Sequence, residues 1–193
     1  MTGDDFGKWD WNAPEIALFE NGYAGAARWF YITYLRGGTA LEFSTEKAFG
    51  KGNFAKLKTA TDYNVVNDRA VVPSDGIYLI YVGLDSREIA IQPLELSGDC
   101  GGSAVQFTTN ADGRTMSATL ASGGRMRIYP NIPAFKKVKK FGSWKREVYV
   151  DPASKAFLYR KNGEGEPNKD YVWKAGTKIT IDFVSKKATI QEP

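Results

Sequence analysis

The parts of this sequence best suited to chemistry are stretches in which aromatic rings alternate with Lys, Arg and Asn. The longest runs from Pro130 to Glu147 and is followed by another from Tyr159 to Glu166, with shorter ones at 8–12 and 49–54. The C–H faces of a pyranose ring pack on an indole or phenol ring, while planar donors and carboxylates reach the sugar hydroxyls. Aromatic rings beside basic side chains equally suit a stacked nucleobase and its phosphate. These stretches therefore indicate ligand binding through ring stacking.

We expect the stronger site in the second half of the chain. Trp144 and Tyr159 are expected to provide ring surfaces there. Arg146, Lys161 and Asn162 are expected to hydrogen-bond sugar hydroxyls, and Glu147 is expected to orient Arg146. A weaker site in the first half is expected from Trp9, Trp11, Lys51 and Asn53. Each assignment has a structural alternative. Tryptophan is often a core residue, Arg146 with Glu147 suits a cross-strand charge pair, and Tyr159 suits an ordinary strand position.

Several kinds of catalysis are excluded by residues that the sequence lacks. There is no histidine, which removes Ser-His-Asp and Cys-His nucleophilic catalysis and His-based zinc sites. The single Cys100 supports neither an internal disulfide nor a multi-thiolate metal site. No glycine-rich phosphate-binding loop is present. We therefore expect no catalytic residue, no metal and no cofactor.

A glycoside hydrolase that uses two carboxylates is the competing enzyme class. The acidic residues available for it are Asp99, Glu147, Asp151, Glu164, Glu166 and Asp170. Such an enzyme needs two of them to face each other across roughly 5 to 10 Å, and one of them needs surroundings that raise its pKa. Glu164 and Glu166 lie among Gly and Pro, which favours a solvated turn. Non-catalytic binding is the interpretation that the sequence favours.

The net charge does not by itself indicate a polyanionic partner, because 26 basic residues stand against 22 acidic ones. One basic tract is concentrated in Lys136-Lys137-Val138-Lys139-Lys140. A solvated loop is its first interpretation. Contact with an acidic glycan, a lipopolysaccharide phosphate or a membrane surface is the second, and nucleic acid is the third, because the charge is confined to one loop. No nucleic-acid partner is expected.

An internal repeat predicts the elements that position these residues. Residues 28–43 have the pattern of a strand, a tight Gly-Gly hairpin turn and a second strand, and residues 114–129 repeat that layout. A closing hairpin follows each copy, at 76–93 and at 176–193, where apolar and polar residues alternate with a period of two. Trp29 and Trp173 lie in such patterns and are expected in the core.

The repeat predicts an all-β chain of two tandem antiparallel β-sandwich domains, immunoglobulin-like or similar to carbohydrate-binding modules. The expected domains are residues 1–93 and residues 94–193. The first repeat lacks the strand that precedes Gly98 in the second. We therefore expect that the chain begins partway into its first domain.

The repeats also carry a resemblance to a known family. The opening Gly3-Asp4-Asp5-Phe6-Gly7-Lys8-Trp9-Asp10-Trp11 is similar to the repeat opening of the SusE and SusF surface lipoproteins of Bacteroides-type starch-utilisation systems. Trp144-Lys145-Arg146-Glu147 and Tyr159-Arg160-Lys161-Asn162-Gly163 resemble the Trp-x-x-Glu and Tyr-Arg-x-Asn-Gly elements of the last repeat of that family. The resemblance covers nearly the whole chain.

This resemblance implies a non-catalytic protein that binds starch-like or other extracellular polysaccharide or oligosaccharide at the bacterial surface. Members of the family are held on the outer leaflet of the outer membrane by a lipidated N-terminal cysteine and work with components of glycan-import complexes. Cys100 lies in mid-chain and does not suit that anchor, so a lipid-anchored precursor is expected. A structural subunit of an outer-membrane complex is a further alternative.

Overall fold

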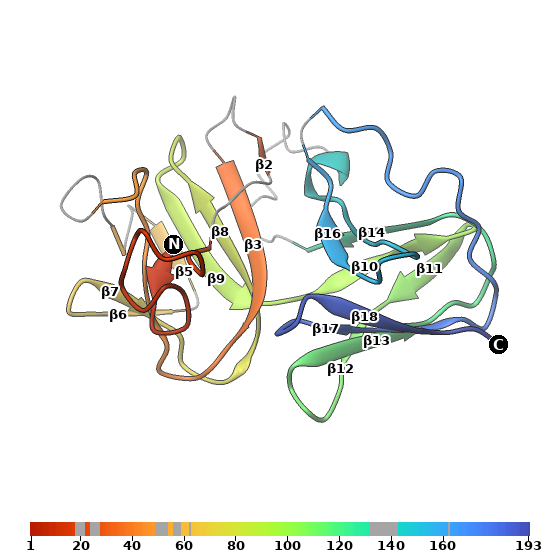
Figure 1. Ribbon diagram of the computed structural model, residues 1–193, viewed down its shortest axis with the longest axis horizontal. Helices are drawn as coiled ribbons and strands as arrows, with labels where there is room; N and C mark the ends of the chain where they lie inside the picture. The colour runs from red at the N-terminus through yellow and green to blue at the C-terminus, as the bar shows by residue number, and fades with distance from the viewer. Residues whose placement is uncertain are drawn as a thin grey trace. The chain divides into compact units, whose positions relative to one another are not determined.

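The computed structural model of this chain describes residues 1–17, 22–23, 28–48, 54–55, 59–61, 63–131, 143–161 and 163–193. The predicted fold class is confirmed, since the chain is all-β and its sheets form β-sandwiches (Figure 1). Residue contacts divide it into two compact units, Met1–Pro93 and Leu94–Pro193, named here unit 1 and unit 2. Within the described segments, no helical structure has the length and apolar character needed to span a lipid bilayer.

Unit 1 arranges its described strands in two sheets. The strands are β1 Thr2–Gly3, β2 Gly22–Tyr23, β3 Arg28–Leu35, β4 Ala40–Glu42, β5 Thr59–Thr61, β6 Asn64–Val66, β7 Arg69–Val71, β8 Gly76–Gly83 and β9 Glu88–Pro93. One sheet has the order β1-β4-β7-β6 and the other the order β2-β3-β8-β9-β5. Their pairing is antiparallel except between β5 and β9.

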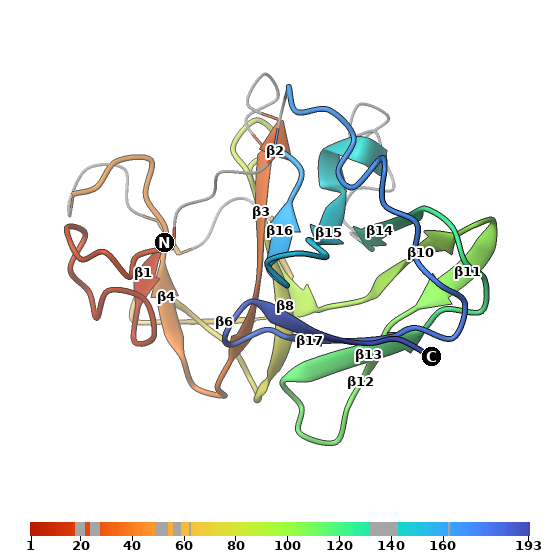
Figure 2. The ribbon, with the colours of Figure 1, turned by 45° about the vertical axis from the view of Figure 1, so that its right-hand side comes forward.

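Unit 2 also has two antiparallel sheets in its described part (Figure 2). Its elements are β10 Leu96–Cys100, β11 Ser103–Gln106, β12 Thr108–Thr109, β13 Thr115–Thr119, β14 Met126–Pro130, the 3-10 helix η3 Ser143–Arg146, β15 Val148–Val150, β16 Phe157–Tyr159, β17 Lys178–Asp182 and β18 Lys187–Gln191. The sheet orders are β11-β10-β14-β15-β16 and β12-β13-β17-β18.

The two Gly-Gly segments do not form hairpins, contrary to the prediction. β3 pairs with β2 and β8, whereas β4 pairs with β1 and β7 in the other sheet. The N–H of Gly37 donates to Asp75 Oδ1 at 2.7 Å, and Gly38, at a φ of 82°, donates to the carbonyl of Val72 at 2.9 Å. Gly123-Gly124 makes the same crossing between β13 and β14. A positive φ at glycine suits a crossing between sheets as well as a hairpin, so the sequence pattern did not distinguish them.

Both closing hairpins are confirmed. β8 pairs with β9, and β17 pairs with β18, in each case antiparallel. The last residue of each connecting loop has a positive φ, 56° at Arg87 and 57° at Lys186. The two units therefore share loop geometry as well as strand order at this position.

The Gly-Asp pair that opens each repeat is explained by close backbone packing. A Cβ on Gly3 would meet the carbonyl oxygen of Ala40, and a Cβ on Gly98 would meet that of Arg127, both closer than the 3.0 Å that real Cβ atoms respect. The strand register makes these two positions equivalent. Gly3 pairs with Leu41, the residue after Ala40, and Gly98 pairs with Ile128, the residue after Arg127. Neighbouring strands approach too closely there for a side chain, so glycine is required.

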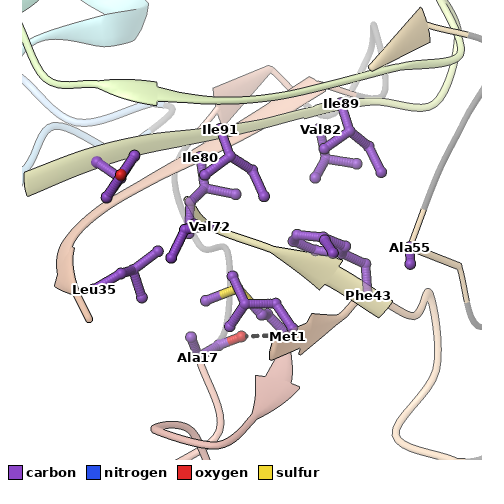
Figure 3. Packing of buried hydrophobic residues seen from close by; sticks show 13 residues of the cluster. Met1, Ala17, Leu35, Phe43, Ala55, Val72, Ile80, Val82, Ile89 and Ile91 are labelled. Atoms are coloured by element: carbon purple, nitrogen blue, oxygen red, sulfur yellow. Dashed lines mark hydrogen bonds between the residues drawn. The ribbon is translucent and has the colours of Figure 1, made fainter. Parts of the chain in front are cut away.

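The core of unit 1 lies between its two sheets (Figure 3). Leu35, Ile80 and Ile91 come from one sheet, and Phe43 and Val72 adjoin strands of the other, and all five are buried. Removing these apolar side chains from water supplies the main favourable term in folding.

The core of unit 2 contains Trp173, as predicted. Only 2% of its surface is exposed, and Tyr171 packs edge-on against it at 5.0 Å between ring centroids. Phe157 and Phe183 pack together at 5.2 Å. Trp29, predicted to lie in the core of unit 1, is only partly buried.

We expect Gly98→Ala to destabilise unit 2 by about 3 kcal/mol, because the added methyl group would overlap the backbone of β14. Gly165→Ala is the matched control, since a Cβ there meets no atom within 4 Å. The control should keep or raise stability, by up to about 1 kcal/mol, because alanine restricts the unfolded chain. Urea unfolding followed by circular dichroism measures both variants. Equal stabilities would contradict the explanation by close packing.

Candidate functional site

The outer surface of the five-stranded sheet of unit 2 carries a row of polar side chains. Along β14, alternating burial turns Met126 and Ile128 inward and Arg127 and Tyr129 outward. Asp99 of β10 pairs with Arg127 in the strand register and shares its side of the sheet. We name this surface the unit 2 face.

A buried carboxylate lies on the unit 2 face. Glu147, which is 2% exposed, immediately precedes β15. Its Oε1 and Oε2 accept hydrogen bonds from Nε and Nη2 of Arg127 at 2.8 and 3.0 Å. Oε2 also accepts one from Nη1 of Arg160, which follows β16, at 2.7 Å. One carboxylate therefore fixes two guanidinium groups from different strands.

The electrostatics keep this triad ionised. Burial opposes ionisation of the Glu147 carboxyl, but hydrogen bonds from Arg127 and Arg160 and their positive charges outweigh it and lower its pKa. The hydrogen bond to Glu147 raises the pKa of Arg127. Glu166 extends the network through ion pairs with Arg125 and Arg127. These carboxylates and guanidinium groups are thus largely matched in charge.

Trp144 stands beside the triad on η3, with 37% of its surface exposed. Arg160 Cζ lies 5.4 Å and Lys145 Nζ 5.1 Å from its ring centroid, within the range of cation–π attraction. A hollow of about 400 Å³ opens here, which we name the Trp144 hollow. It is lined by Arg127, Trp144, Arg160, Gly163, Glu164 and Glu166.

Arg146 does not pair with Glu147, contrary to the prediction. Glu147 binds Arg127 and Arg160 instead, and Nη1 of Arg146 donates to the carbonyl of Pro130 at 3.4 Å. The two residues are consecutive at the end of η3, and side chains of successive residues diverge there. Arg146 lines a second, smaller hollow on the unit 2 face.

Tyr159 does not present a ring surface on the unit 2 face, contrary to the prediction, and it occupies an ordinary strand position, which was the alternative. It pairs with the inward-facing Val148 in the strand register, and its ring packs against buried Phe157 at 5.9 Å between centroids. It does not line the Trp144 hollow. Its neighbour Leu158 has the more exposed side chain. Side chains alternate along a strand, so a shift of one residue decides which of them faces outward.

Lys161 is exposed near the Trp144 hollow, and its backbone N–H donates to Glu164 Oε2 at 2.9 Å. Asn162 lies outside the described residues, as do Lys51, Asn53 and the basic tract 136–140.

The predicted ring pair of unit 1 separates into two different environments. Trp11 is only 4% exposed and lines an apolar cavity of about 430 Å³, so the prediction that it presents a free ring surface is wrong. Trp9 is partly exposed, but Arg69 Cζ stacks over its ring at 3.9 Å. Nε1 of Trp9 donates to Asp4 Oδ1 at 3.0 Å. One face of the Trp9 ring and its indole N–H are therefore already occupied by contacts within unit 1.

Sequence reasoning missed Arg127 and Arg160, which contribute the guanidinium groups of the Trp144 hollow. A signal for Arg127 was present, since it occupies a polar place in the alternating run Met126–Pro130. Arg160 belongs to the motif Tyr159-Arg160-Lys161-Asn162-Gly163, but it was not among the residues predicted to bind a ligand.

Four of the six acidic residues considered for catalysis are bound by neighbouring groups. Glu147 and Glu166 pair with arginines, and Glu164 accepts from the N–H of Lys161. Asp151 accepts from the N–H and hydroxyl of Ser154, and backbone hydrogen bonding from Ser154 contributes most to the lowering of its pKa. Among the described residues, no cluster of three or more acids or cysteines is placed to hold a metal ion.

Comparisons with known proteins include a solved structure with the same fold. No family model and no curated protein matches the sequence. The crystal structure of SusF from Bacteroides thetaiotaomicron is similar, with a TM-score of 0.76 and 19% sequence identity over 98% of this chain. The match covers 46% of the SusF chain, so this chain spans about half of its length. At this level of identity the likeness shows the fold.

We expect Glu147→Gln to destabilise unit 2 by about 3 kcal/mol at neutral pH, because two arginines lose their buried counter-charge. The pKa of Glu147 is lowered in the folded state, so its contribution is complete above the ordinary glutamate pKa and disappears as the pH falls through the lowered value. The difference in stability between wild type and variant should therefore be constant at neutral pH and shrink in acid.

Urea unfolding at a series of pH values measures this difference. Asp170→Asn is the control, because Asp170 is highly exposed and its ion pair to Lys169 spans 4.0 Å. Such a surface pair contributes about 0 to 1 kcal/mol. A Glu147→Gln variant as stable as Asp170→Asn would contradict the role assigned to the buried carboxylate.

Proposed function

We propose that this chain binds extracellular polysaccharide without cleaving it, and that the Trp144 hollow of unit 2 is its principal site. The observation that carries the proposal is a partly exposed indole beside two arginines that a buried glutamate holds in place. An indole offers a flat apolar surface to the C–H face of a pyranose, and guanidinium groups offer several donors to its hydroxyls.

The arginines of the Trp144 hollow are held in place in the absence of a ligand. Glu147 engages Nε and Nη2 of Arg127 and Nη1 of Arg160, so the arginines are ordered before a ligand arrives. Ordering long side chains upon binding would cost about 0.5 to 1.5 kcal/mol for each. Glu164 and Glu166 add acceptors at the rim, which complement sugar hydroxyl donors.

The cellular role proposed here follows the family that the repeats resemble. The motif resemblance and the fold shared with SusF support a place at the cell surface, on the outer membrane, through a lipid-anchored precursor. They also support a partnership with components of a glycan-import complex. The sugar and its linkage are left to the binding experiment.

A hydrolytic role is less well supported by the same geometry. A general acid needs surroundings that raise its pKa, whereas Glu147 has a lowered pKa and is paired with two arginines. Glu166 also shares Arg127. These pairs favour binding over proton transfer.

We expect Trp144→Ala to weaken retention of the protein by polysaccharide about tenfold or more, because the stacking surface is lost. Affinity electrophoresis in gels that contain starch, xylan, mannan, mixed-linkage glucan or polygalacturonate measures retention. The melting temperature should stay close to that of wild type, since the ring is partly exposed. Trp144→Phe keeps a ring and should restore part of the retention.

Three results would contradict the proposal. The first is unchanged retention by Trp144→Ala on the polysaccharide that retains wild type. The second is release of reducing sugar from that polysaccharide by the wild-type protein, which would indicate a hydrolase. The third is retention by none of the five polysaccharides, which would favour a structural subunit.

Trp9→Ala tests the weaker site proposed for unit 1. We expect a smaller loss of retention than with Trp144→Ala, because Arg69 already covers a face of the Trp9 ring and Asp4 holds its N–H. The same gels compare the two variants. A loss as large as that of Trp144→Ala would contradict the ranking of the two sites, and a larger one would place the principal site in unit 1.

A further inference from the structure

We propose that the hollow around Arg146 is a second sugar subsite on the unit 2 face, and that together with the Trp144 hollow it takes a neutral glycan longer than one residue. This inference rests on the proposed function and specifies the form and charge of the ligand.

The second hollow has about 250 Å³ and a polar lining. The residues around it are Glu95, Ser97, Gly98, Gln106, Tyr129, Pro130, Asn131 and Arg146. We name it the Arg146 hollow. Its lining combines a carboxylate, a guanidinium, amides and hydroxyls. A sugar hydroxyl donates one hydrogen bond and accepts others, so a mixed set of donors and acceptors matches it better than a surface of one sign.

Arg146 contributes a shielded donor without an acceptor to this lining. Its Nε is shielded from solvent and no described residue accepts a hydrogen bond from it. Its hydrogen bond from Nη1 to the carbonyl of Pro130 is long, at 3.4 Å. A guanidinium has five N–H donors, and a shielded donor without an acceptor costs free energy until a ligand oxygen reaches it.

Three other polar groups of the hollow, on Glu95, Asn131 and Gln106, are already positioned by hydrogen bonds. Asn131 donates through Nδ2 to Glu95 Oε2 at 2.6 Å, and its backbone N–H donates to the carbonyl of Glu95 at 2.8 Å. Gln106 Nε2 donates to the carbonyls of Leu96 and Phe107, both at 3.2 Å. The arrangement is rigid, so a sugar that enters it orders few side chains.

Strand geometry makes the two hollows neighbours. Arg127 lines the Trp144 hollow and Tyr129 lines the Arg146 hollow. These residues are two apart on β14, about 7 Å along the strand, and Arg127 Cζ lies 5.6 Å from the Tyr129 ring centroid. η3 contributes Trp144 to one hollow and Arg146 to the other. A glycan that fills both hollows must therefore contain at least two linked sugar residues.

The charges favour a neutral ligand. The lining of the Trp144 hollow contains two arginines, Arg127 and Arg160, and two glutamates, Glu164 and Glu166. In the Arg146 hollow, the carboxylate of Glu95 offsets the charge of Arg146, so the lining offers no excess positive charge to an acidic sugar. Binding should accordingly depend little on salt, whereas affinity for a polyanion falls steeply as salt rises.

The test measures binding of the full chain by calorimetry. The probes are the disaccharide and the hexasaccharide of whichever polysaccharide retains wild type in the gels. We expect the hexasaccharide to bind wild type about tenfold more tightly than the disaccharide. Arg146→Gln should remove most of that gain and leave disaccharide affinity within about twofold. Raising the salt to about 0.5 M should leave hexasaccharide affinity nearly unchanged.

A second variant guards against local disturbance of η3. Ser97→Tyr fills the Arg146 hollow from β10, opposite Tyr129, and tyrosine suits a strand. It should lower hexasaccharide affinity to the level of Arg146→Gln. Arg114→Gln and Thr119→Tyr are the matched controls, since both residues belong to the other sheet of unit 2 or adjoin it. Both controls should retain wild-type affinities.

The outcomes separate this inference from the proposed function. The second subsite would be overturned if Arg146→Gln and Ser97→Tyr bound the hexasaccharide as tightly as wild type. If Trp144→Ala lost binding in the same experiment, the proposed function would remain intact. Binding of polygalacturonate alone, weakened by salt, would overturn the neutral ligand. Absence of binding by wild type to every glycan would overturn both proposals.

Discussion

The unit 2 face depends on the bonds between one buried carboxylate and two arginines. Glu147 is almost fully shielded from water, so its charge would be costly without Arg127 and Arg160. The three charges hold one another in place, and Glu166 adds a second carboxylate that pairs with Arg127 and Arg125. A face that is ordered and nearly neutral before it meets a ligand suits polyhydroxylated molecules, whose recognition depends on the direction of hydrogen bonds more than on net charge.

This arrangement exists only because three separate chain segments become neighbours. The order β14-β15-β16 sets Arg127, Glu147 and Arg160 side by side, although they are far apart in sequence. The backbone N–H of Arg160 donates to the carbonyl of Glu147 at 3.0 Å, and that of Glu147 donates to the carbonyl of Trp144 at 3.3 Å. The ring and the guanidinium groups are thus positioned by the same short stretch of backbone.

The features predicted correctly from the sequence are those that depend on local pattern. The closing hairpins and the buried Trp173 follow from alternation over a few residues. The Gly-Gly crossings were mistaken for hairpins, because a glycine turn does not reveal whether the next strand joins the same sheet. Two predictions were wrong for a related reason: that Tyr159 presents an outward ring surface, and that Glu147 pairs with Arg146. Both depend on strand register and on neighbours distant in sequence, which one sequence does not specify.

Comparison of the two units separates what the scaffold requires from what the site requires. Gly3 and Gly98 occupy equivalent places, each beneath the carbonyl of a neighbouring strand, and there the scaffold accepts no other residue. The residue that supplies this carbonyl is Ala40 in unit 1 and Arg127 in unit 2. Its backbone serves the sandwich in both units, while its side chain is free to differ. A guanidinium at that position gives Glu147 its bidentate partner, and alanine offers none. The same fold therefore carries an arginine-lined hollow in unit 2 and lacks its central guanidinium in unit 1.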